Sequence, residues 1–137
     1  MGLILDSSLV IAAERRGDTV EQLIARIIGA TGDQGAALSA IGLTELMHGI
    51  FRAKTPEMRR RRETFINELL ADLTVYPYTK ETALVAGKID GEQQSRGVVI
   101  PFADLLIGTT ALVLGFQVAT NNLRDFQRIP GLSVIQL

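Results

Sequence analysis

Short apolar runs alternate along this chain with longer segments in which apolar residues recur at the spacing of one helix face. Val20, Leu23, Ile24, Ile27 and Ile28, for example, form a single stripe of this kind. The pattern predicts strands at 3–5, 36–38, 74–76, 117–120 and 133–135. It predicts helices at 8–15, 20–30, 41–52, 56–72, 80–96 and 101–114.

Strands separated by helices favour parallel pairing, because the chain then crosses back through a helix before each new strand. The expected fold is of the α/β class, a three-layer α/β/α sandwich with a central, mainly parallel sheet of about five strands. No repeat, low-complexity tract or linker interrupts the pattern, so residues 1–137 are expected to form a single domain.

The composition narrows the class of protein. Hydrophobic residues make up 47% of the chain and charged residues 21%, which favours a globular protein over a disordered one. Cysteine is absent, which excludes disulfides, thiolate metal ligands and cysteine nucleophiles. No apolar run is long enough to span a bilayer and the start lacks a basic signal segment, so no membrane contact and a cytoplasmic location are expected.

A basic segment stands out because the net charge of the whole chain is only −1. The stretch "FRAKTPEMRRRRE", residues 51–63, contains four consecutive arginines, Arg59, Arg60, Arg61 and Arg62. In a helix these side chains spread around most of the circumference, so some of them must face solvent. Two interpretations stay open: an ordinary solvated helix face, or contact with RNA phosphates.

Acidic residues follow the predicted strands, at the end of a parallel sheet where ligands bind. Asp6 comes directly after the first strand, Glu45 lies in the first two turns of the helix after the second, and Asp104 lies in the first turn of the helix that begins near Pro101. Each has a structural alternative: Asp6 can cap a helix, Glu45 can be an exposed helical acid, and Asp104 can interact favourably with its helix N-terminus.

Carboxylates that met at one edge of the sheet would repel one another. At a separation of about 4 Å and an effective dielectric of about 20, each pair costs about 4 kcal/mol. Such a cluster therefore needs a cation or raised pKa values. Oxygen ligands without cysteine, and with a single histidine, favour Mg²⁺ or Mn²⁺ over Zn²⁺.

Four segments together carry a family resemblance. "LILDSSLVI", "SAIGLTELMHGI", "IPFADLLIGTTAL" and "VATNNLRDFQRIPGL" resemble, in order, the four signature blocks of the PIN domain, and specifically of the VapC ribonuclease toxins of bacterial toxin–antitoxin pairs. The resemblance implies an endoribonuclease that depends on Mg²⁺ or Mn²⁺ and hydrolyses RNA phosphodiester bonds with metal-activated water. It also implies an RNA substrate, a VapB-like antitoxin whose C-terminal segment occupies the active-site groove, and a homodimer.

The resemblance also implies roles for individual residues. Asp6, Glu45 and Asp104 correspond to the metal-binding acids, and Ser8 corresponds to the hydroxyl residue that orients the acidic site. A noncatalytic PIN-type scaffold that binds RNA or a partner protein remains the alternative function, and a metal-dependent cleavage assay would distinguish the two.

The fourth block departs from the family pattern. Many relatives have an acid two residues after the threonine, where this chain has Asn122. Asn122 can act as a neutral oxygen ligand, and Asp125 can supply the missing charge from one turn further on. Both are therefore candidate catalytic residues. Gly108, one turn after Asp104, either leaves room beside the site or allows close helix packing.

Overall fold

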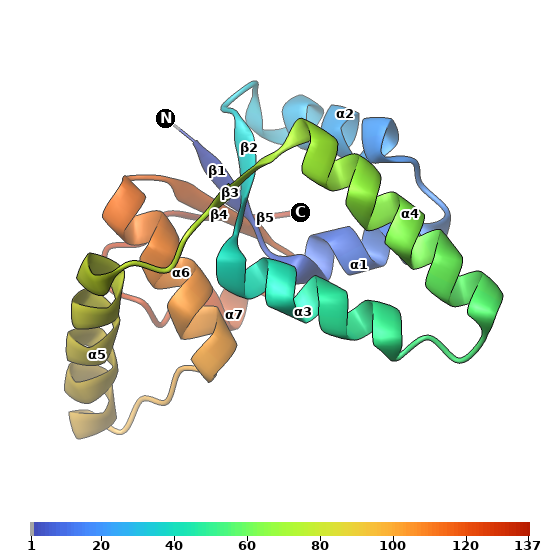
Figure 1. The fold of residues 1–137 in the computed structure, drawn as a ribbon. Coiled ribbons are helices and arrows are strands. Elements are labelled where there is room, and N and C mark those ends of the chain that lie inside the picture. The colour runs from blue at the N-terminus through green and yellow to red at the C-terminus, as the bar shows by residue number, and fades with distance from the viewer. Residues whose placement is uncertain (1) are drawn as a thin grey trace.

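The computed structural model describes residues 2–137 and shows a five-stranded sheet in which every neighbouring pair of strands is parallel (Figure 1). The strand order is β3-β2-β1-β4-β5. The strands are β1 (Leu3–Leu5), β2 (Ala36–Ser39), β3 (Thr74–Tyr76), β4 (Gln117–Thr120) and β5 (Val134–Gln136). The helices are α1 (Ser7–Arg16), α2 (Val20–Thr31), α3 (Ala40–Phe51), α4 (Pro56–Asp72), α5 (Lys80–Ser95), α6 (Phe102–Leu114) and α7 (Leu123–Phe126).

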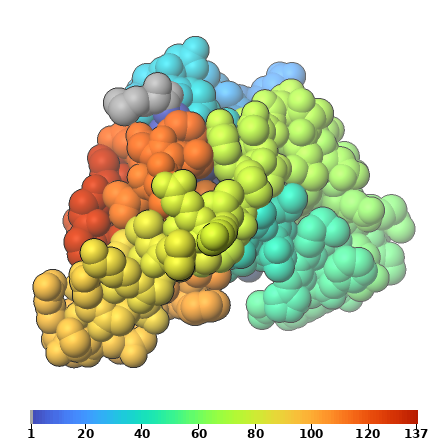
Figure 2. Space-filling view, turned by 60° about the vertical axis from the view of Figure 1, so that its left-hand side comes forward, coloured from blue at the N-terminus to red at the C-terminus, as the bar shows by residue number. Residues whose placement is uncertain are grey.

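The three-layer α/β class predicted from the hydrophobic pattern is confirmed. Side chains of successive strand residues point to opposite faces of the sheet. Leu3 and Leu5 join a buried cluster with α1 to α4, whereas Ile4 joins a second cluster with α5, α6 and Phe126 of α7. Figure 2 shows α5, in yellow, as a ridge at the lower left, with α3 and α4, in teal and green, on the opposite side.

The predicted boundaries of these strands and helices differ from the observed ones by no more than one residue at any end. The pattern did not predict α7. The hydrophobic pattern predicts no helix after 101–114, but Leu123–Phe126 form a single helical turn. A turn of this length is too short to show the 3.6-residue periodicity on which a prediction of a helix depends. None of the helices in residues 2–137 combines the length and apolar character that a membrane span requires.

Several helices begin directly at strand ends, and this places their first turns at one edge of the sheet. Ser39 ends β2 and also caps α3, since its Oγ accepts a hydrogen bond from the Gly42 N–H at 2.9 Å. Asp6 separates β1 from α1 as a single residue. Because β1 pairs with β2 on one side and with β4 on the other, Asp6 lies at the point where the strand order reverses, which is where such sheets bind ligands.

Candidate functional site

Asp6 is buried, with 4% of its surface exposed, although it lies at the N-terminus of α1. Its side chain makes no capping hydrogen bond to the helix, so the capping alternative is wrong. Instead, Oδ2 of Asp6 accepts hydrogen bonds from Ser8 Oγ at 2.6 Å and from Thr120 Oγ1 at 2.8 Å. Two hydroxyl groups, one from α1 and one from the neighbouring strand β4, therefore orient this carboxylate.

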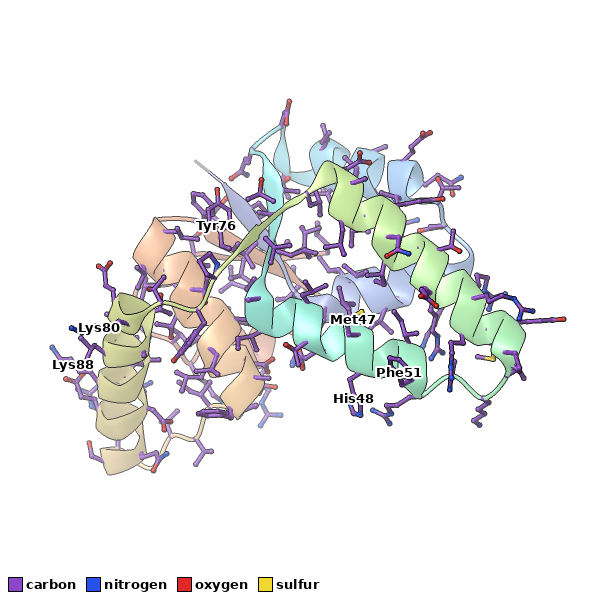
Figure 3. The ribbon with its side chains drawn as sticks, in the orientation of Figure 1. Met47, His48, Phe51, Tyr76, Lys80 and Lys88 are labelled. Carbon is purple, nitrogen blue, oxygen red and sulfur yellow. The ribbon has the colours of Figure 1, made fainter. Side chains whose placement is uncertain are left out.

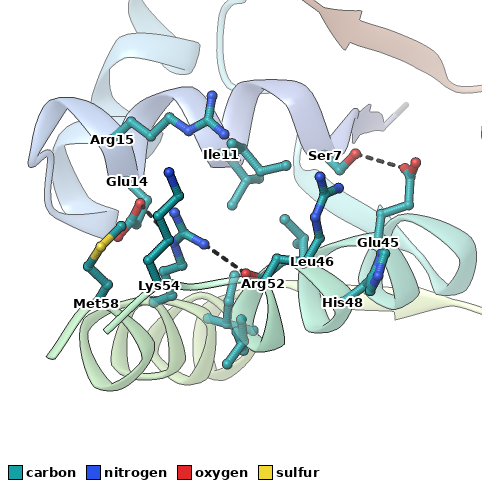
Figure 4. A pocket seen from close by; sticks show the side chains of 15 residues that line it. Ser7, Ile11, Glu14, Arg15, Glu45, Leu46, His48, Arg52, Lys54 and Met58 are labelled. Atoms are coloured by element: carbon teal, nitrogen blue, oxygen red, sulfur yellow. Dashed lines mark hydrogen bonds and ion pairs between the residues drawn. The ribbon is translucent and has the colours of Figure 1, made fainter. Parts of the chain in front are cut away.

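Glu45 projects from α3 toward α1. Its Oε1 accepts a hydrogen bond of 2.8 Å from Oγ of Ser7, the buried first residue of α1. The bond links two helices that begin at neighbouring strands, and it orients the Glu45 carboxylate toward the edge where Asp6 lies (Figure 4).

Asp104 lies in the first turn of α6, as predicted, and is only partly exposed. Burial raises its pKa from 3.8 to about 7, with further contributions from the negative charges of Asp6, Asp125 and Glu45. The four carboxylates come from four different segments of the chain, and each of the other three is close enough to disfavour the charged form of Asp104.

Asn122 and Asp125 form a linked pair after β4. Nδ2 of Asn122 donates a hydrogen bond to Asp125 Oδ2 at 2.8 Å, and the Asn122 backbone N–H donates to Thr120 Oγ1, also at 2.8 Å. On its other side, Asp125 Oδ1 lies 3.8 Å from a guanidinium nitrogen of Arg128. Thr120 thus connects this pair to Asp6, and Arg128 partly balances the charge of Asp125.

The chemistry of these donors fits a hard divalent cation, since every candidate ligand is an oxygen atom and carboxylates predominate. Burial is the largest cause of the raised pKa of Asp104, and the negative charges of Asp6, Asp125 and Glu45 add to it, so a bound cation would offset this repulsion. Nevertheless, within residues 2–137, no three Asp, Glu or His side chains are arranged to hold a metal ion.

The sequence as a whole matches the family model of the PIN domain over residues 3–132. The chain belongs to the PIN domain family. It is 37% identical over 135 residues to a protein of Rickettsia bellii named Ribonuclease VapC, and the match covers 98% of this chain and 96% of that one. It is 33% identical over 97 residues, or 71% of each chain, to the tRNA(fMet)-specific endonuclease VapC of Salmonella typhimurium.

Solved structures of other proteins share the fold of this PIN domain. A crystal structure of VapBC2 from Rickettsia felis bound to a promoter DNA fragment superposes with a TM-score of 0.86 at 22% identity, covering 100% of this chain and 99% of that one. The DNA-bound VapBC of Salmonella typhimurium gives 0.83 at 26% identity, with coverage of 99% and 98%.

Two hydroxyl residues of this site, Ser7 and Thr120, were not singled out as positioning residues from the sequence. Both lie beside strand ends, where serine and threonine commonly form caps and turns, so the sequence carries no signal that separates the two roles. Only the tertiary contacts with Glu45 and Asp6 do so.

The arginine run of this PIN domain mainly packs α4 against its neighbours. Arg62 donates to the backbone oxygen of Gly49 at 2.8 Å, and both Arg61 and Arg62 lie within 4 Å of the buried carboxylate of Glu14. The Arg59 guanidinium lies 5.2 Å above the ring centre of Phe51, a cation–π contact. These contacts are structural, and contact between the run and RNA stays a prediction.

Proposed function

We propose that this PIN domain is a metal-dependent endoribonuclease that acts as the toxin of a VapBC-type toxin–antitoxin system. The observation that carries the proposal is the convergence of Asp6, Glu45, Asp104 and Asp125 at the carboxyl edge of the sheet. There, burial and then the charges of the other three carboxylates raise the pKa of Asp104. The relatives named ribonucleases and endonucleases support the assignment of RNA as the substrate.

Asp6, Glu45 and Asp104 are the residues that would hold Mg²⁺ or Mn²⁺. A divalent cation bound by such acids lowers the pKa of water, so that water can attack a phosphodiester, and offsets the charge that builds on the phosphoryl oxygens. The oxygen donors of this site and the absence of cysteine from the chain support this choice of cation.

The chain's own residues prepare the carboxylates for this role. Ser8 and Thr120 both donate to Oδ2 of Asp6, so the other Asp6 carboxylate oxygen is free of hydrogen bonds to residues 2–137. Ser7 holds Glu45 in the same way. Asp104 must lose its proton before it can bind a cation, so binding should release about one proton well below pH 7 and about half a proton at pH 7. Binding of the cation should therefore strengthen as the pH rises through 7.

Asn122 and Asp125 form the outer part of the proposed site. Asp125 adds a negative charge near Asp104, and the Asn122 amide fixes its orientation through the hydrogen bond to Oδ2. We propose that Asp125 takes the place of the acid that many relatives have at the Asn122 position, and that Asn122 positions it.

A VapB-like antitoxin is the proposed protein partner, because the solved structures with the same fold include complexes named VapBC. A homodimer and a cytoplasmic location complete the proposal. Co-expression with the product of a neighbouring short gene, followed by size-exclusion chromatography with light scattering, tests the partner and the stoichiometry together.

The nuclease activity is tested with purified protein, Mg²⁺ and defined RNAs. Transfer RNA(fMet) is the first substrate to try, because the relative from Salmonella typhimurium is named for it. Asp6→Asn and Asp104→Asn should each reduce the cleavage rate by about 100-fold or more, in line with the loss of one electrostatic group from an active site. Asp72→Asn, at an exposed position at the end of α4, is the matched control and should cleave like the wild type.

Cleavage at the wild-type rate by either site variant would overturn the assignment of the acids. If the wild type itself binds RNA but does not cut it in Mg²⁺ or Mn²⁺, the noncatalytic scaffold is the correct function. Within residues 2–137, no three acidic or histidine side chains are arranged to hold a metal ion, and this observation keeps the second function under test.

A further inference from the structure

We infer that a basic pocket beside the acidic site binds the phosphate backbone of the RNA strand, through Arg15, Arg52 and Lys54. The pocket lies between α1, α3 and the start of α4 and has a volume of about 500 Å³ (Figure 4). The inference rests on the proposed function, because it takes RNA as the substrate and specifies how this chain holds it.

The charge of the basic pocket differs in sign from that of the whole chain. Three arginines and one lysine line it, together with two carboxylates, which leaves a local formal charge of +2 against −1 for the chain. These charged residues are Glu14, Arg15, Glu45, Arg52, Lys54 and Arg62. A local excess of this kind attracts a polyanion to one place on a protein that otherwise has little attraction for it.

The cations in the pocket fall into two groups. Arg62 is already engaged by Glu14 and by the Gly49 carbonyl. Arg15, Arg52 and Lys54 are exposed, and the structure of residues 2–137 gives their side chains no ion pair or hydrogen bond. Figure 4 shows the side chains of Arg52 and Lys54 extending from the α3–α4 side toward α1, and that of Arg15 lying along α1 at the border of the pocket. The charges of all three are therefore available to a ligand.

The basic pocket is continuous with the proposed active site. Ser7 and Glu45, which are hydrogen-bonded to each other at 2.8 Å, line one end of it. An RNA strand whose scissile phosphodiester lies at the acids must continue away from them. The pocket offers the neighbouring phosphates three cations, whose attraction exceeds the repulsion of those phosphates by Glu45. The apolar side chains of Ile11, Leu46 and Met58 line the same pocket and can contact a base.

The test is the salt dependence of RNA binding, measured in EDTA so that binding is scored independently of cleavage. A single-stranded RNA oligonucleotide is titrated with the wild type and with the combined variant Arg15→Gln, Arg52→Gln and Lys54→Gln at several salt concentrations. Each lost phosphate contact should lower the slope of log K against log salt by about 0.7, so the combined variant should lose about 2 from the slope.

The matched control neutralises three exposed cations at α5, namely Lys80, Lys88 and Arg96. Figure 3 shows Lys80 and Lys88 on α5, far from the helix that carries His48 and Phe51. The control has the same change of net charge but should keep the wild-type slope to within about 0.5. Thermal melting verifies that both variants are folded. If the combined pocket variant is unfolded, the three single substitutions replace it, and each should lower the slope by about 0.7.

An unchanged slope in the pocket variant, or an equal loss in both variants, overturns the inference. Retention of RNA binding together with loss of binding to an acidic peptide would also overturn it, because the pocket would then serve a protein partner. A wild type that cuts RNA but shows no effect of the pocket substitutions leaves the proposed function standing without this inference. A wild type that binds RNA through the pocket without cutting it supports this inference and overturns the proposed nuclease activity.

Discussion

Asp104→Asn should make the metal-free protein more stable at alkaline pH. In the folded wild type, burial and the charges of Asp6, Asp125 and Glu45 raise the pKa of the Asp104 carboxyl from 3.8 to about 7. The folded state therefore holds this proton up to about pH 7, whereas the unfolded chain releases it near pH 4. Folding stability is lost as the pH rises from about 4 through 7, and the loss is complete above about pH 8.

The size of this change in folding stability follows from the shift in the pKa of Asp104. One pKa unit corresponds to about 1.4 kcal/mol, so the shift from 3.8 to about 7 sets an upper limit of about 4 kcal/mol. Asp104 is only partly buried, and water screens its interactions with the other carboxylates, which reduces this to about 2 kcal/mol. About two thirds of that loss should fall between pH 5 and pH 8.5.

Urea unfolding in EDTA at these two pH values measures the effect. The stability of the variant relative to the wild type should rise by about 1.4 kcal/mol from pH 5 to pH 8.5. Asp72→Asn removes an exposed carboxylate outside the site and should show no such change. Addition of Mg²⁺ at pH 8.5 should stabilise the wild type more than the variant, because a cation that binds only the folded state adds to its stability. Parallel pH profiles for the wild type and Asp104→Asn in EDTA would refute the reasoning.

Gly108→Ala should destabilise the protein by about 1–3 kcal/mol in urea unfolding, because an added Cβ would meet the Ile129 side chain closer than contact distance. Gly87→Ala, in open space on α5, should instead stabilise the protein by about 0.5–1 kcal/mol. Equal effects at the two positions would contradict the packing role of Gly108. In the outer part of the site, Asp125→Asn should raise the Mg²⁺ concentration for half-maximal cleavage by about 10-fold or more, and Asn122→Ala should produce a smaller rise. A larger effect of Asn122→Ala would make Asn122, not Asp125, the fourth ligand.

The hydrophobic pattern was sufficient to predict the α/β class, because strand and helix periodicities are local properties of the chain. The alternation of short apolar runs with helical stripes led to the parallel sheet and to six of the helices to within a few residues. The four family blocks were sufficient to place Asp6 directly after β1, Glu45 in the helix that follows β2, and Asp104 in the first turn of α6, since these positions are visible in the local sequence.

The contacts within the site depended on the tertiary structure, because they join residues that are distant in the chain. Thr120 donates to Asp6 across 114 positions and Ser7 donates to Glu45 across 38, and no local pattern encodes either pairing. The raised pKa of Asp104 likewise requires burial and the approach of three other segments.

The arginines show the same division between sequence and structure. Four identical residues in a row predict only a basic helix, but successive residues point about 100° apart around the helix axis, so each meets a different environment. Arg62 turns inward to Glu14 and Gly49, and Arg59 lies over Phe51. The free cations beside the acids are instead Arg15, Arg52 and Lys54, which come from separate segments of the chain. The sequence determined how much charge this protein carries, and the packing of the helices decided where that charge is available.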